Sequence, residues 1–100
     1  MYKIKQTKLF STWLTKLKDI KGKISILRRV DRLKNGNFGD YKYISENIYE
    51  LRISSEPGYR VYYIKDADKI VILLIGGDKS SQNIDIKKAK IFAKEYKDEK

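Results

Sequence analysis

The sequence contains neither histidine nor cysteine. Without cysteine it has no disulfide framework and no thiolate metal site. The lack of histidine removes the commonest metal ligand and the usual general base near neutral pH. We therefore expect no metal and no other cofactor, and any catalysis has to use the side chains of Arg, Lys, Tyr, Asp or Glu.

Long apolar runs are missing as well. The longest, residues 70–75, has the length of a buried strand and is far too short to span a bilayer. The first residues alternate Lys with apolar side chains and form no hydrophobic signal core. We therefore expect a cytoplasmic protein with no membrane partner. With 100 residues, a single proline, no repeat and no linker, the chain is expected to form one domain over residues 1–100.

Positive charge is abundant and unevenly distributed. The net charge is +10, and residues 1–35 hold eleven Lys or Arg and two Asp, a net +9. Because each basic side chain placed on a phosphate releases counterions, this concentration predicts a polyanionic partner such as nucleic acid or the ribosome. The alternative is the ordinary solvated face of two Lys-rich helices.

Helical periodicity dominates the first third of the chain. Apolar residues spaced by three and four predict two amphipathic helices, one along Phe10, Trp13, Leu14 and Leu17 and one along Ile26, Val30 and Leu33. Gly22 is expected to separate the helices, and Asn35-Gly36 to end the second. Tyr2 to Lys5 is expected to form a short strand before them.

From residue 41 onward the period changes to two. Residues 47–54, 59–65 and 69–75 are predicted to be three antiparallel strands, with turns at Pro57-Gly58 and at residues 66–68. A last helix is expected to bury Ile86, Ala89, Phe92, Ala93 and Tyr96, with Ser80, Ser81 or Asn83 as its N-cap. This order predicts an α+β fold in which a small antiparallel sheet packs against two N-terminal helices and a C-terminal helix.

The predicted strands bring together candidate residues for phosphate chemistry. Glu50 and Arg52 share one face of their strand because they are two residues apart, and Arg60 lies near the start of the next strand. In a hairpin, Arg52 and Arg60 would be close enough to hold one phosphate and to stabilise charge that builds during cleavage. The alternative is a cross-strand salt-bridge cluster that serves only solubility, and spacing alone leaves both readings open.

Two loops add further candidates. In residues 76–82, Lys79 is placed to contact a phosphate, although a simple strand-to-helix turn explains the same pattern. In residues 36–42, Phe38 and Tyr41 fit the edge of the core. Tyr41 or Tyr43 could instead stack on an RNA base.

These stretches, read together, resemble a known family. GNFGDYK (36–42), ELRI (50–53), PGYRVYY (57–63) and IGGDKSSQ (75–82), followed by Asp85-Ile86 and Ala89, are similar to the phage-derived branch of the RelE/HigB toxins, often labelled addiction module killer proteins. The match runs from about Phe10 to Phe92. The resemblance implies a RelE-like fold and a ribosome-dependent endonuclease that cuts mRNA in the A site. In such toxins the RNA 2′-hydroxyl attacks the adjacent phosphate without a metal.

The resemblance also implies roles for individual residues. Arg60, in the GYR motif, would contact the phosphate in the transition state, and Arg52 stands where such sheets carry a basic residue on the neighbouring strand. Lys79 or Ser80 falls at the position of a second catalytic arginine, for which Lys79 is our candidate. An extra lysine of RelE is replaced by Glu50, a catalytic tyrosine aligns roughly with Ile86, and the HigB histidines have no counterpart. The general base is therefore open between Glu50, a tyrosine such as Tyr62, and catalysis by electrostatics alone.

The leading hypothesis is therefore a type II toxin that binds mRNA and the ribosome and is silenced by an antitoxin, which we expect to be acidic and to bring a DNA-binding domain. The residues expected to contact RNA are Lys42, Tyr41, Ser80, Arg28, Arg29 and Arg32. The alternatives are a non-catalytic RNA- or DNA-binding module derived from such a toxin, and a basic structural accessory of the ribosome.

Overall fold

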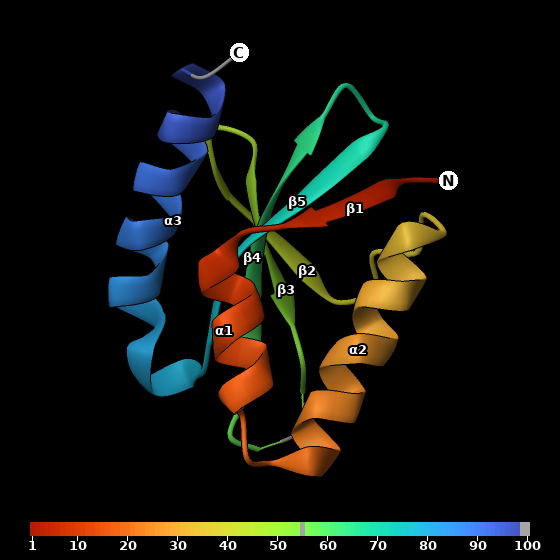
Figure 1. Ribbon diagram of the computed structural model, residues 1–100, viewed down its shortest axis with the longest axis vertical. Coiled ribbons are helices and arrows are strands. Elements are labelled where there is room, and N and C mark those ends of the chain that lie inside the picture. The colour runs from red at the N-terminus through yellow and green to blue at the C-terminus, as the bar shows by residue number, and fades with distance from the viewer. Residues whose placement is uncertain (55, 99–100) are drawn as a thin grey trace.

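A five-stranded sheet lies between helices in the computed structural model, which describes residues 1–54 and 56–98. Helices α1 and α2 pack on one face and α3 on the other (Figure 1). The elements are β1 (Lys3–Gln6), α1 (Lys8–Lys16), α2 (Ile20–Lys34), β2 (Tyr41–Ser45), β3 (Ile48–Arg52), β4 (Arg60–Asp66), β5 (Ile70–Gly77), the short 3-10 turn η1 (Lys79–Ser81) and α3 (Gln82–Asp98). The predicted α+β fold is confirmed.

The sheet has more strands than the three predicted in its antiparallel part. Its order is β1-β5-β4-β3-β2, with successive antiparallel pairs from β2 to β5 and a parallel pair between β1 and β5 at the other edge. Strand β2 begins at Tyr41, inside the segment 36–42 for which the sequence predicts a loop leading into the sheet. Glu46 and Asn47, both with positive φ, form the two-residue turn that closes the β2–β3 hairpin.

The boundary between the first two helices differs from the prediction. Asp19, not Gly22, marks the break: its carboxylate Oδ1 accepts a hydrogen bond from the Gly22 backbone N–H at 3.0 Å and so caps α2. Gly22 lies in the first turn of α2 and is buried, and a Cβ there would lie 2.4 Å from Tyr59 Cε2. The glycine therefore permits close packing of the helix on Tyr59. The predicted end of α2 at Asn35-Gly36 is confirmed.

The start of the C-terminal helix also differs. A 3-10 turn, η1, precedes α3: Asp78 is the N-cap of η1 and accepts from the Ser80 backbone N–H, and Ser81, one of the three residues expected to cap the helix, completes a capping box with Asp78. A carboxylate is the stronger acceptor for the free N–H groups of a first turn. The turn then continues directly into α3.

Because successive side chains along each strand point to opposite faces of the sheet, the hydrophobic core is divided into two clusters. On the α1/α2 face, Phe10, Ile26 and Leu33 pack against strand residues that include Leu51, Val61 and Tyr63. On the α3 face the buried residues are Ile48, Tyr62, Ile64, Ile72, Leu74, Ile75 and Ala89. Trp13 packs against the first cluster, as its helical spacing predicted. Within residues 1–54 and 56–98, no helix has the length and apolarity needed to cross a membrane.

Candidate RNA-binding and cleavage site

Two rows of residues cross the sheet on the face that carries α3. One row aligns Arg52, Arg60 and Gly77 on β3, β4 and β5, and the next aligns Lys42, Glu50 and Tyr62 on β2, β3 and β4. The predicted closeness of Arg52 and Arg60 is therefore confirmed as a direct cross-strand pair. The first row lies where β3 ends and β4 begins, beside the turn that leads into α3.

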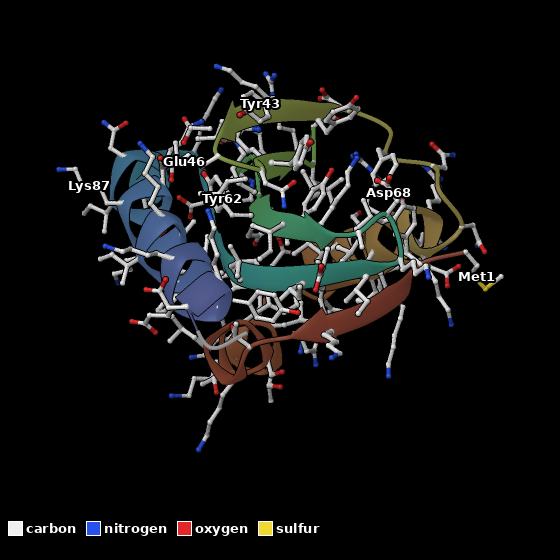
Figure 2. All side chains as sticks on the ribbon, turned by 90° about the horizontal axis from the view of Figure 1, so that it is seen from above. Met1, Tyr43, Glu46, Tyr62, Asp68 and Lys87 are labelled. Atoms are coloured by element: carbon white, nitrogen blue, oxygen red, sulfur yellow. The ribbon has the colours of Figure 1, made fainter. Side chains whose placement is uncertain are left out.

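A buried carboxylate anchors the site. Glu50 is 1% exposed, and its Oε2 accepts hydrogen bonds from the Tyr62 hydroxyl at 3.0 Å and from Gln82 Nε2 at 2.7 Å. Its Oε1 lies 4.0 Å from Arg52 Nε. Figure 2 shows Tyr62 on the side of the sheet that faces α3. Because Glu50 is fully buried, the cluster is not a surface salt-bridge network that serves only solubility.

The two arginines have unused hydrogen-bonding capacity. Arg60 is only 8% exposed and the Arg52 side chain is 40% exposed, and the Nε of each has no hydrogen-bond partner within residues 1–54 and 56–98. Each guanidinium group carries one positive charge, and one carboxylate balances only half of their combined charge. A buried donor without a partner costs about 1–3 kcal/mol, so an anion bound here would gain both charge and hydrogen bonds.

Tyr62 is a hydrogen-bond donor in this site and not a base. Burial, followed by the charge and the hydrogen bond of Glu50, raises the pKa of the Tyr62 hydroxyl far above its ordinary value. The hydroxyl therefore keeps its proton at neutral pH. Of the two side chains considered as general base, this favours Glu50, whose Oε1 receives no hydrogen bond from the part of the chain that the structure describes.

The turn before α3 places Lys79 beside the arginine row. A Cβ on Gly58 would lie 3.6 Å from the Lys79 Cβ, so the Lys79 stem packs against the turn that precedes Arg60. Lys79 is exposed, which leaves its ammonium group in solvent at the rim of the site. The Ser80 hydroxyl instead donates to the Asp78 carboxylate, so it serves the cap of the helical turn.

The residues expected to contact RNA are not brought to one surface. Lys42 shares the face of Glu50, whereas Tyr41 is aligned with Leu51 and faces the opposite side, where its ring lies 5.9 Å from that of Phe38. Phe38 packs against the core, as predicted for this loop. The three arginines Arg28, Arg29 and Arg32 lie on α2, which covers the face opposite the site.

Arg29 has a structural role that its sequence context did not indicate. Its guanidinium group donates hydrogen bonds to the backbone carbonyl oxygens of Arg52, Phe38 and Asp40. It thereby fastens the loop before β2 to the end of β3. The contact with RNA predicted for Arg29 has no geometric support, while Arg28 and Arg32 are exposed.

Two site residues had no role in the sequence-based interpretation. Gln82 holds Glu50 from the start of α3, and Asp85, only 6% exposed, accepts a hydrogen bond from the Ser81 hydroxyl and lies over Gly77. No spacing rule links Gln82 to a residue 32 positions earlier. Among residues 1–54 and 56–98 there is no group of three or more His, Cys, Asp or Glu that could hold a metal ion.

The fold and the arginine row define a small α+β protein whose sheet carries two guanidinium groups beside one buried carboxylate, and comparison with known proteins gives its family. The family model "Phage derived protein Gp49-like (DUF891)" matches residues 12–97, and the chain belongs to this family. An uncharacterized protein of Haemophilus influenzae is 51% identical over 92 residues, which cover 92% of this chain and 93% of that protein.

Solved structures share the architecture at low sequence identity. A chain of the intact E. coli RelBE toxin-antitoxin complex superposes with a TM-score of 0.53 at 16% identity, covering 78% of this chain and 96% of that chain. The conserved hypothetical protein HP0894 from Helicobacter pylori has a TM-score of 0.49 at 22% identity, covering 80% and 97%. The similarity to the RelBE chain confirms the fold class expected from the sequence motifs.

Proposed function

We propose that this protein is the toxin of a toxin-antitoxin pair and that it cleaves mRNA in the ribosomal A site. The observation that carries the proposal is the direct pairing of Arg52 with Arg60 beside the buried Glu50. The similarity to a chain of a toxin-antitoxin complex and the concentration of positive charge in residues 1–35 support it. The narrower assignment to HigB-like addiction module killer proteins stays a prediction.

The proposed reaction is an internal transfer of the phosphoryl group. The 2′-oxygen attacks the adjacent phosphorus, the bond to the 5′-oxygen breaks, and the products are a 2′,3′-cyclic phosphate and a 5′-hydroxyl. Arg52 and Arg60 stabilise the extra negative charge on the phosphate oxygens in the transition state. Glu50 accepts the 2′ proton, and the departing 5′-oxygen, stabilised by the Lys79 ammonium group, takes a proton from solvent to become the 5′-hydroxyl.

Four other residues expected to contact RNA divide between two roles in this proposal. Lys42 and Ser80, on the α3 side, lie along the mRNA, and the exposed Arg28 and Arg32 on α2 hold ribosomal RNA at the opposite face. An acidic antitoxin would associate rapidly with so basic a chain and cover the site.

Induced expression of the wild type, of the Arg52→Ala/Arg60→Ala double variant and of Lys69→Ala tests the proposal. Lys69 is exposed in the turn between β4 and β5, away from the arginine row, and serves as the control for loss of one positive charge. We expect growth arrest and new mRNA 5′-ends with the wild type and with Lys69→Ala, and neither with the double variant.

The same three proteins are then incubated with programmed ribosomes, after circular dichroism has shown that each is folded. Loss of even one transition-state contact typically lowers the rate about 10²- to 10³-fold, so the double variant should fall to background. Wild-type protein that binds the ribosome and leaves the mRNA intact would refute the proposal and favour the non-catalytic binding module.

A further inference from the structure

A cavity of about 420 Å³ opens at the end of β5, between α1 and α3. Strand β1 pairs with β5 only as far as Leu73, so the last residues of β5 face the cavity without a strand beside them on that side. Two aromatic side chains, Trp13 and Tyr59, and two carboxylates, Asp78 and Asp85, line the cavity. The Gly77 backbone on β5 and the Thr12 side chain on α1 also line it.

Two successive glycines bring an indole and a carboxylate onto opposite sides of the strand. A Cβ on Gly76 would lie 2.3 Å from Trp13 Cε3, and a Cβ on Gly77 would lie 1.9 Å from Asp85 Oδ2. Any side chain at either position would therefore push one of these groups out of place. The cavity thus depends on a flat aromatic surface and an acid, both seated directly on the backbone.

The chemistry of the walls selects the kind of ligand. Asp85 is 6% exposed, and its Oδ2 accepts from the Ser81 hydroxyl, which fixes the carboxylate at the cavity wall. A carboxylate accepts hydrogen bonds, so the ligand has to present N–H or O–H donors to it. A planar ring suits the Trp13 wall, and among the nucleobases guanine offers adjacent N–H donors that match one carboxylate.

We propose that this cavity binds a guanine base of the RNA, next to the phosphate held by Arg60. This inference rests on the proposed function and names the nucleotide preference of that site. Arg60 and Gly77 are paired across neighbouring strands, which lie about 5 Å apart, a span that one nucleotide covers. Lys88, exposed at the cavity, provides a contact for the next phosphate.

Binding can be measured without the ribosome, because Trp13 is the only tryptophan in the chain and lines the cavity. We expect guanosine monophosphate to quench its fluorescence with an affinity at least several-fold above those of the adenosine, cytidine and uridine monophosphates. Asp85→Asn should weaken guanosine monophosphate binding about tenfold or more, since it removes a charged acceptor. Asp68→Asn, the same change on the distant β4–β5 turn, should have no effect.

A second pair of variants avoids any disturbance of the buried acid. Thr12→Phe fills the cavity from an exposed position on α1 and should abolish quenching, whereas Thr15→Phe, exposed on the same helix and outside the cavity, should not. Equal quenching by all four nucleotides, no quenching, or quenching by arginine amide alone would each overturn the proposal. These outcomes do not depend on cleavage, so they are distinguishable from failure of the proposed function.

Discussion

The contact between Gly77 and Asp85 can be tested through stability. A Cβ on Gly77 would lie 1.9 Å from Asp85 Oδ2, so in Gly77→Ala the carboxylate has to move by at least about 1 Å and to weaken its bond with Ser81. Overpacking and a disturbed buried hydrogen bond together cost about 1–3 kcal/mol. Alanine recovers about 0.5–1 kcal/mol, because glycine loses more backbone entropy on folding. We expect a net loss of about 1–2 kcal/mol.

The same substitution should behave differently once the carboxylate is gone. In an Asp85→Ala background the nearest remaining atom is Ser81 Oγ, 2.8 Å from the added Cβ, and this hydroxyl is free to rotate. Gly77→Ala should then be close to neutral. The two substitutions should therefore show a coupling energy of about 1–2 kcal/mol in a double-mutant cycle.

Urea unfolding followed by circular dichroism measures all four proteins of the cycle. In thermal unfolding, Gly77→Ala alone should lower Tm by about 5–15 °C. If Gly77→Ala costs the same in both backgrounds, to within about 0.5 kcal/mol, Asp85 is not seated on Gly77, and the arrangement of the cavity wall is refuted.

Three further predictions concern contacts outside the cavity wall. Burial, followed by a hydrogen bond to a carboxylate, raises the pKa of Tyr59 from its ordinary value of 10.0 to about 12. The protonated Tyr59 therefore stabilises the fold below pH 10, and this contribution is lost as the pH rises toward 12. In Tyr59→Phe the urea midpoint of unfolding should fall less between pH 10 and pH 12 than in the wild type. Thr7 caps α1 and also bonds to β5, so Thr7→Val should cost about 1–2 kcal/mol, while the exposed Thr15→Val should change urea stability little. Arg29→Ala removes a donor from three carbonyl oxygens, of which that of Asp40 keeps a second donor, the Arg52 backbone N–H, and it should lower the free energy of unfolding by about 1–3 kcal/mol. Unchanged unfolding would show that Arg29 does not hold the loop.

Some elements could not be derived from local pattern. Strand β2 was missed because a bulge between Tyr43 and Ser45 interrupts its alternation. Gly22 suggested a helix break, since a glycine that allows close packing looks the same in sequence as one that ends a helix. Both errors arise where the meaning of a residue depends on what lies opposite it in space.

The pairing of Arg52 with Arg60 on one face, with Glu50 beside them, followed from the sequence itself. A strand has a period of two, and a short turn at Pro57-Gly58 leaves little freedom in how the next strand returns. The two N-terminal helices could be predicted from the spacing of their apolar residues, because the helix, like the strand, repeats with a regular period.

Only the tertiary structure decided which distant groups complete the site. In the folded protein Gln82 binds Glu50, Arg29 holds backbone carbonyl oxygens, and Arg28 and Arg32 lie on the helix that covers the other face of the sheet, not beside the arginine row. The packing of helices on a sheet depends on volumes and partners far apart in the chain, and no local period records them.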